Sequence, residues 1–460
     1  MKFSLILTAL ILLGVSSCTS PSSKKQEAAA EGQAAPSDAE TNQRGLMATP
    51  NAAGKMSTFP SYNPAFPPPA KAKDVFELSQ DYPTSFNDKE TFAWEKIDFK
   101  TKPNDYAMAV LRYCLEGNVE TNFQWQQNKV RKWFHAPWLH EGTGGREWMH
   151  GMTRERGTKK FEIHAKQDVE LENWAVGVYN EPGGYALGRI WRTPDGKPDP
   201  SKAVFPRGSV AFKLLFTDAA VEKVPYLAGS FEWQGNIYPC EPLECKKRET
   251  RTVRLLQIDI AVKDPRAPLG WVLGTFTYDA SIKAKTPWER LVPVGISWGD
   301  DPSVTAMLNN VGSFVNPALK ESWINPALLE DATKKKPEQN YMRHHGLGGR
   351  LNGPVDNPSS SCISCHARAA VTAEGEPFSV MPRGAKRETY KSEDFKKYFA
   401  AMKSGSYSIT EGDKKFTTTD YSLQVAFGIR AYYQNLLDKQ PKTRDIMASE
   451  RKLPELTRGE

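Results

Sequence analysis

No apolar run in this chain of 460 residues is long enough to cross a membrane as a helix, because the stretch from Phe3 to Val15 is too short to span a bilayer. The sequence also lacks any run of five or more basic residues. Its net charge of +7 is therefore spread over a mixed, solvated surface, which disfavours nucleic acid as a partner. There is no internal repeat and no recognised catalytic motif, so pattern alone assigns neither a repeat fold nor an enzyme class.

The first residues have the form of an export signal. Lys2 followed by the short apolar stretch predicts a secretory signal peptide over residues 1–17. The sequence Val15-Ser16-Ser17-Cys18 then places small residues before a cysteine, which resembles the lipobox of bacterial lipoproteins. That resemblance implies cleavage before Cys18 and a diacylglycerol anchor on its sulfur. The alternative is an ordinary signal peptide with an incidental cysteine.

Two features near Cys18 extend this interpretation. Thr19 stands where inner-membrane lipoproteins carry aspartate, so the resemblance favours a periplasm-facing lipoprotein of the outer membrane over one of the inner membrane. Residues 18–60 are rich in Ala, Ser, Pro, Gln and Glu and cannot bury enough apolar surface to offset their ordering entropy. We expect a lipidated, disordered tether there, so that the lipid anchor provides the contact with the membrane.

The most informative motif lies late in the chain, at Cys362-Ile363-Ser364-Cys365-His366. C-x-x-C-H is the pattern of covalent c-type haem attachment, in which two thiols add to the two haem vinyl groups. The adjacent His366 then donates an imidazole nitrogen to the iron as proximal ligand. We therefore expect one covalent haem c on Cys362, Cys365 and His366, which agrees with the export signal that such attachment requires.

Two other uses of this motif stay open. Paired cysteines can also form a redox dithiol or half of a zinc site. A dithiol motif should follow a hydrophobic strand, whereas residues 348–361 have the composition of a loop. A zinc site needs further ligands, and only His344 and His345 lie nearby in the sequence.

The remaining cysteines give weaker predictions. Cys240 and Cys245 bracket a short loop-like segment, and an oxidising compartment favours a disulfide between them over free thiols or a metal site. Cys114 lies next to Tyr113 and Leu115 on an expected helix, which favours a buried apolar thiol over a nucleophile.

Hydrophobic periodicity predicts an α+β protein whose large domain, residues 61–330, is mainly antiparallel β-sheet with helices before it. Asn104 to Gly117 has helical spacing, with Asn104 as the expected cap. From about residue 160 to about 300 the apolar period is two, and the clearest strand contains residues 256–262. Further expected strands are Trp174–Tyr179, Tyr185–Trp191, Ser209–Phe216, Trp271–Tyr278 and Leu291–Trp298, and residues 264–270 are the expected hairpin connection.

Residues 340–445 are predicted to form a small, mostly helical haem c domain. Ser392 caps one expected helix, which ends at Gly405, and Thr419 or Asp420 caps a second. The polar sequence Lys334-Lys335-Lys336-Pro337 marks the expected boundary before this domain.

The second axial ligand decides whether the iron carries electrons or reacts with a substrate, because a strong ligand closes the iron. Met381, which precedes a proline, is similar to the distal Met-Pro pair of many small cytochromes c. Met402, a histidine such as His344 or His345, and an open site are the alternatives.

One aromatic-rich segment, residues 133–154, gathers polar side chains that suit a haem edge or a substrate cleft. Aromatic rings exclude water, arginine pairs with propionates or other anions, and histidine moves protons. The alternative is an aromatic packing corner with exposed polar tips. The five candidates are His135, His140, His150, Arg146 and Arg154.

Together, the C-x-x-C-H motif and the lipobox resemble those of bacterial monohaem cytochrome c lipoproteins. That resemblance implies electron transfer to a redox partner protein in the periplasm.

A second resemblance rests on Phe205-Pro206-Arg207-Gly208-Ser209-Val210 before a strand, the β-rich middle and the late haem motif. This order is similar to the cytochrome c′-beta family and its lysine-cross-linked relatives that oxidise hydroxylamine. This chain and its tail after the motif are longer than theirs, and no particular lysine is matched. The alternative function is thus a haem enzyme acting on peroxide, nitric oxide or hydroxylamine at an open iron.

Overall fold

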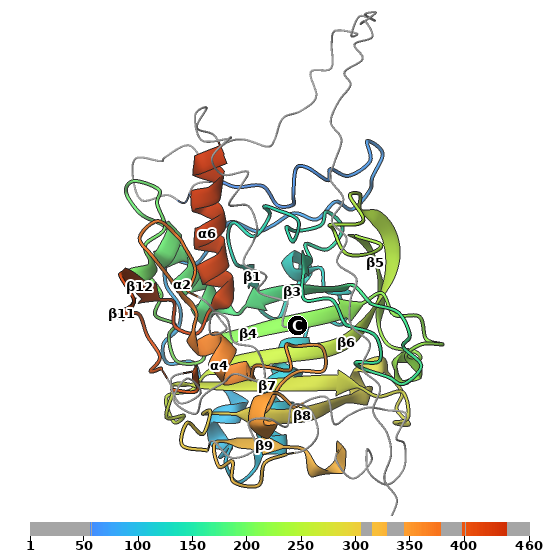
Figure 1. Cartoon of the computed structure of the whole chain (residues 1–460). Coiled ribbons are helices and arrows are strands. Elements are labelled where there is room, and N and C mark those ends of the chain that lie inside the picture. Colours follow the sequence, from blue (N-terminus) through green and yellow to red (C-terminus); the bar gives the residue numbers. More distant parts are fainter. Residues whose placement is uncertain are drawn as a thin grey trace, which may run out of the picture. The chain divides into compact units, whose positions relative to one another are not determined.

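The computed structural model describes Met56 and residues 58–304, 315–328, 345–378, 398–400 and 402–438 (Figure 1). These residues belong to one compact unit that begins at Gly45. None of the described helices is long and apolar enough to cross a membrane. The helices are α1 (Pro103–Leu115), α2 (Glu181–Trp191), α4 (Cys362–Ala367) and α6 (Leu423–Asp438), and short 3-10 helices lie at Ala93–Lys96, Trp125–Gln127, Pro200–Lys202, Pro225–Leu227, Pro287–Arg290 and Leu347–Gly349.

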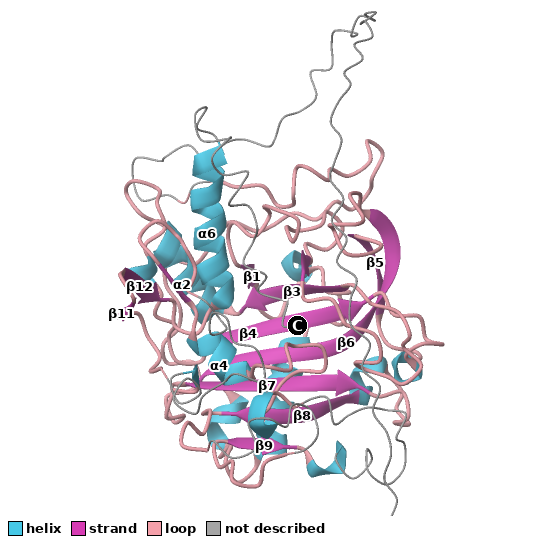
Figure 2. Ribbon diagram, viewed as in Figure 1, coloured by secondary structure: helices cyan, strands magenta, loops and turns pink. Residues whose placement is uncertain are grey.

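A large antiparallel sheet organises these residues (Figure 2). Its strands follow the order β1-β3-β4-β6-β7-β8-β9, while β2 pairs with β3 and β5 pairs with β6. The expected antiparallel β-rich region is therefore confirmed, and the protein is α+β. The strands are β1 (Phe134–His135), β2 (Thr153–Arg154), β3 (Asn173–Tyr179), β4 (Val210–Thr217), β5 (Glu232–Ile237), β6 (Glu249–Lys263), β7 (Trp271–Tyr278), β8 (Leu291–Ser297) and β9 (Ser322–Ile324).

Most of the predicted strands are confirmed. The four expected at 174–179, 209–216, 271–278 and 291–298 correspond to β3, β4, β7 and β8. The predicted hairpin is also present, because Lys263 at the end of β6 pairs with Trp271 at the start of β7. Period-two patterning was therefore a reliable signal for this sheet.

The strand predicted at Tyr185–Trp191 is wrong, because these residues form the second half of α2. Asn180 precedes this helix, and its Oδ1 accepts a hydrogen bond from the backbone N–H of Gly183 at 3.4 Å. Pro182 lies in the first turn, where it is compatible with a helix. The residues that start this helix, Asn180 and Pro182, therefore lie before the segment predicted as a strand.

Helix α1 agrees with the prediction except at its start. Lys102, and not Asn104, occupies the N-cap position, and Pro103 is the first helical residue. Gly117 follows the helix with φ of 75°, a left-handed conformation that suits glycine. Cys114 is fully buried, as expected of an apolar thiol.

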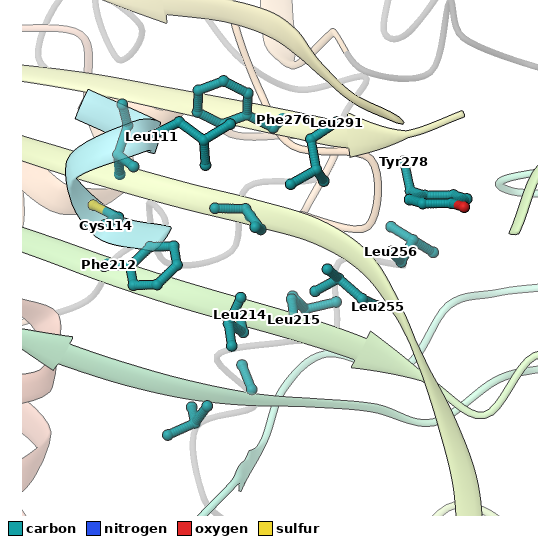
Figure 3. Packing of buried hydrophobic residues seen from close by; sticks show 14 of the residues in the cluster. Leu111, Cys114, Phe212, Leu214, Leu215, Leu255, Leu256, Phe276, Tyr278 and Leu291 are labelled. Atoms are coloured by element: carbon teal, nitrogen blue, oxygen red, sulfur yellow. The ribbon is translucent and has the colours of Figure 1, made fainter. Parts of the chain in front are cut away.

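One face of the sheet is apolar and packs against α1. Alternate residues of β4 and β6, among them Phe212, Leu214 and Ile258, share a hydrophobic cluster with Leu111 and Cys114 of the helix (Figure 3). We call this the α1 cluster. Its members are almost fully buried, so this face is the main source of hydrophobic stabilisation.

The opposite face is covered in part by the C-terminal segment, whose helices α4 and α6 appear in front of the strands in Figure 1. Tyr179 and Leu273 of the sheet share a second cluster with Ile363 of α4 and with Val425 and Ile429 of α6. We call this the α6 cluster. The C-terminal segment also contains a small antiparallel sheet in the order β10-β12-β11, formed by Ala370–Val371, Lys414–Thr418 and Ser408–Glu411.

Several predictions fall outside the described residues. They are the signal peptide and Cys18, the boundary at 334–337, His344, Met381 and the helix start at Ser392. The second expected C-terminal helix is present as α6, although it begins at Leu423. Its cap is Ser422, whose Oγ accepts a hydrogen bond from the N–H of Val425 at 3.1 Å, instead of Thr419 or Asp420.

Candidate haem-attachment site

The C-x-x-C-H motif forms the short helix α4, which is held by a polar network at its start. Ser361 caps the helix: its Oγ accepts from the N–H of Ser364 at 3.1 Å, and the Oγ of Ser364 accepts from the N–H of Ser361 at 3.0 Å. The Oγ of Ser361 in turn donates to the buried carboxyl of Asp300 at 2.6 Å. Since α4 is too short to be stable alone, these contacts fix its position.

Both cysteines of α4 are free thiols whose side chains are only half-buried. Burial raises the pKa of Cys365 to about 12. Burial, followed by the negative charges of Asp356 and Asp259, raises the pKa of Cys362 well above its usual value. A reactive dithiol needs a lowered thiol pKa, so this environment disfavours that alternative use of the motif.

His366 has the hydrogen-bonding state that an iron ligand requires. Its Nδ1 lies 2.9 Å from the backbone carbonyl oxygen of Tyr421. A carbonyl only accepts, so Nδ1 carries the proton and donates it. Burial lowers the pKa of His366, which favours the neutral ring. In that tautomer the lone pair of Nε2 is available to a metal, the arrangement found in metal-ligating histidines.

A row of polar and small residues crosses the sheet on the face that α4 and α6 cover. Pairing across β3, β4, β6, β7 and β8 places Gly177, Lys213, Asp259, Thr275 and Gly295 side by side. We call these five residues the polar row. Lys213 and Asp259 form an ion pair at 3.0 Å and keep side-chain exposures of 24% and 23%. These two charged side chains at the centre of the sheet therefore remain partly accessible to solvent on this face.

Segments close to the motif in sequence, and α6, lie over the polar row. A Cβ on Gly177 would overlap Nε2 of Gln424 in α6, and a Cβ on Gly295 would come within 2.9 Å of Leu351. Gln257, which neighbours the row on β6, donates to Asp259 at 2.7 Å and accepts from the N–H of Val355 at 3.4 Å. These close approaches explain why small residues occupy the row.

The polar row carries ionisable groups whose charges reach the motif. Burial alone would lower the pKa of Lys213, but Asp259, Glu155 and Asp356 together raise it well above its usual value. Burial, and then the charge of Asp259, raises the pKa of Asp356. The charges of Lys213 and Asp356 also act on His366, with opposite sign. The charges of the polar row and of Asp356 therefore act on the environment of His366.

The five candidates in residues 133–154 divide into different environments. His135 is buried between Phe76 and Trp125, with ring centroids 5.1 and 6.1 Å away. His140 is also fully buried and lies 3.1 Å from Glu141. The buried Arg146 donates to the backbone carbonyl of Ala136. These three side chains pack in the interior, and their polar tips are buried where the packing-corner interpretation expected them to be exposed.

The other two candidates lie further along the same segment. His150 stacks on Trp233 at 4.1 Å, and burial lowers its pKa to about 4. Arg154 pairs with Glu172 at 2.6 Å and with Glu241 at 3.0 Å. Both side chains therefore have structural partners.

The segment nevertheless meets the C-terminal region. Trp138 contacts Tyr432 of α6 with ring centroids 5.0 Å apart, and Asn435 of α6 donates to Glu141 at 2.6 Å. Trp138 also belongs to the α6 cluster, together with Ile363. The aromatic part of the segment thus packs against the motif-bearing region.

The other candidates can now be placed. Met402 is half-buried against the α6 cluster, and its carbonyl accepts from the hydroxyl of Tyr421 at 2.5 Å. His345 is buried and pairs with Leu351 in an isolated β-bridge. Cys240 and Cys245 are joined in a disulfide, with their Cα atoms 5.6 Å apart.

Sequence reasoning missed the polar row and the carbonyl of Tyr421. Lys213 and Asp259 alternate with apolar residues, a pattern that indicates a solvent-facing side of a strand. Their signal lay only in being charged at the centre of long strands. Among the described residues, no group of three or more His, Cys, Asp or Glu side chains is arranged to hold a metal ion.

No protein family, curated protein or solved structure matches this chain.

Proposed function

We propose that this protein is an exported c-type cytochrome, tethered to the outer membrane through Cys18, that passes single electrons to a periplasmic partner. Cys362 and Cys365 hold one haem through thioether bonds, and His366 binds its iron. The observation that carries the proposal is the hydrogen bond of His366 at the end of α4. Its Nδ1–H donates to the backbone carbonyl of Tyr421, so the lone pair of Nε2 is available to bind a metal.

The haem, when bound, supplies the one-electron redox couple. The chain's residues orient and enclose it. Asp300 and Ser361 fix the start of α4, and Tyr421 fixes the ring of His366. Apolar neighbours such as Ile363 and Ala367 exclude water from one side of the motif.

The test is an optical spectrum of protein made with the haem-maturation machinery. We expect a reduced spectrum of c-type haem that survives denaturation and acid extraction, because the haem is covalently attached. Replacing both cysteines, as Cys362→Ser with Cys365→Ser, should leave any haem extractable. A wild-type chain without a covalent haem band would refute the proposal.

A second candidate is a haem enzyme acting on a small molecule, and the polar row favours it. Lys213, Asp259 and Asp356 are ionisable groups near the motif, and burial raises the pKa of the Asp356 carboxyl, which brings its proton exchange closer to neutral pH.

Carbon monoxide distinguishes the two candidates. A reduced iron that binds carbon monoxide readily supports the enzyme, because one axial position is then open. A low-spin spectrum that carbon monoxide leaves unchanged supports the electron carrier, because a strong sixth ligand closes the iron.

A further inference from the structure

Asp420 is a buried carboxylate with an unusual number of donors around it. Its oxygens accept from the ammonium group of Lys263 at 2.7 Å and from the indole N–H of Trp271 at 2.9 Å. They also accept from the backbone N–H groups of Phe205 at 2.8 Å and Gly405 at 2.7 Å. One side chain, 1% exposed, therefore ties together both ends of the β6–β7 hairpin and two loops.

The backbone at Asp420 is held in a conformation that other residue types avoid. Asp420 has φ of 47° and the following Tyr421 has φ of 69°, both in the left-handed region. For a non-glycine residue this conformation costs about 1–2 kcal/mol, and it persists only where the surroundings enforce it. Here the four donors to the carboxylate hold Asp420 in this conformation. The hydroxyl of Tyr421 holds the next residue by donating to the carbonyl of Met402.

The same turn produces the contact with the proposed iron ligand. The second of the two left-handed residues is Tyr421, and its carbonyl accepts a hydrogen bond from Nδ1–H of His366 at 2.9 Å. Immediately afterwards Ser422 caps α6 and accepts or donates a hydrogen bond with the hydroxyl of Tyr179 at 2.8 Å. The direction of this carbonyl is thus set by residues 420–422.

We infer that Asp420 is a positioning residue for His366, acting through the carbonyl of Tyr421 to set the orientation and the donor strength of the imidazole. This inference rests on the proposed haem function. A strong hydrogen bond from Nδ1 makes the ring a better electron donor, which stabilises the oxidised iron. Loosening the turn weakens that bond, so it raises the reduction potential.

The test compares two buried aspartates of the full-length holoprotein. Asp420→Asn removes the charge and replaces an acceptor with a donor that faces other donors. Asp264→Asn is the matched control: Asp264 is 2% exposed, accepts from Arg266 at 2.5 Å and Tyr106 at 3.0 Å, and lies in the same hairpin. Its partners belong to the α1 side of the protein.

We expect Asp420→Asn to raise the reduction potential and to speed hydrogen exchange at Nδ1 of His366. We expect Asp264→Asn to lower the melting temperature while leaving both quantities at their wild-type values. Unchanged potential and exchange in Asp420→Asn, whatever its melting temperature, would overturn the inference, because a purely structural role moves only stability.

Two further measurements keep the test decisive. If Asp420→Asn does not fold, Trp271→Phe replaces it, because this change keeps an aromatic ring and removes one donor to Asp420. It should speed hydrogen exchange at Nδ1 of His366 by a smaller factor. Exchange at the wild-type rate in Trp271→Phe would count against the inference. Exchange at Nδ1 can also be followed in haem-free protein. A wild-type chain that never binds haem covalently refutes the proposed function, and the haem-free exchange rates still decide whether Asp420 controls the ring.

Discussion

The two faces of the main sheet are made by the same strands and differ most at the centre of the sheet. On one face, β4 and β6 present Phe212, Leu214 and Ile258 to α1, and these side chains are buried. On the other face, the alternate positions of the same strands carry Lys213 and Asp259, which stay partly exposed beneath the C-terminal segment. Strand alternation thus places a fully buried apolar layer on one face and, on the other, the polar row that we propose serves the function.

The separation has a physical reason. An apolar face gains free energy in proportion to the area it removes from water, so it is filled completely. A face that is to hold a large ligand must leave room, and charged groups there need partners, as Lys213 and Asp259 provide for each other. Substitutions on the two faces should therefore affect different measurements.

The largest effect is expected on the apolar face. Phe276→Ala removes a fully buried ring from the α1 cluster and should lower the free energy of unfolding by about 3–5 kcal/mol. Denaturant unfolding measures this change, with Phe161→Ala, at a side chain that is 48% exposed, as the control. The optical spectrum of the folded, haem-loaded variant should match that of the wild type. An altered spectrum would show that the apolar face also affects the haem site.

Asp300, which anchors α4, should make stability depend on pH. Burial is the main cause that raises its pKa from the usual 3.8 to about 7. Between these values the folded protein holds a proton that the unfolded chain releases, so the free energy of unfolding falls as pH rises, by up to about 4 kcal/mol.

Asp300→Asn should remove this contribution, because the amide does not titrate and its oxygen still accepts from Ser361. Denaturant unfolding between pH 4 and about 8 measures the difference between wild type and variant. Parallel stability curves for the two proteins would show that Asp300 is not the titrating group.

A smaller effect is expected at Gly177, where the polar row meets α6. Gly177→Ala places a Cβ against Nε2 of Gln424 and should cost at most about 1 kcal/mol, because this terminal amide can move aside. Adding Gln424→Ala should recover most of this loss, because the overlap is with that side chain. Gly144→Ala is the control, since its Cβ would meet only ordinary contacts at 3.7 Å. If the changes in the free energy of unfolding of the two substitutions simply add in the double variant, Gln424 of α6 does not contact the polar row at Gly177.

The smallest effect on stability is expected at the ion pair of the polar row. Lys213→Met should change the free energy of unfolding by only about 0.2–1 kcal/mol, because both partners are partly exposed. The same change removes a positive charge near the motif, so the reduction potential should fall. Lys223→Met, which breaks the exposed pair with Asp168, controls for loss of a lysine elsewhere. Equal reduction potentials in the two variants would show that the charge of Lys213 does not act on the iron, and would contradict a role of the polar row in the site.

Local patterns carried the predictions that succeeded. The strands at β6 and β7 follow from alternation within a few residues. The haem motif also needs only its own five residues, and haem attachment there stays a prediction. The error at α2 came from interpreting Tyr185–Trp191 without Asn180, the residue that starts the helix.

What sequence could not supply depends on distant contacts. The polar side of β6 looked solvent-facing because nothing nearby in sequence indicates that residues 351–356 and α6 would cover it. The partner of His366 is a backbone carbonyl, which every residue type possesses, and it lies 55 positions away in the chain. Its direction is set by Asp420, whose donors come from four different segments.

If α4 is a covalent haem site, the intact mass of the denatured chain must include the haem. The protein is expressed with the haem-maturation machinery, unfolded in acid and weighed beside the Cys362→Ser, Cys365→Ser double variant. We expect the wild-type chain to carry the added mass of one haem and the double variant to carry none. A wild-type chain at the mass of the bare polypeptide would contradict it.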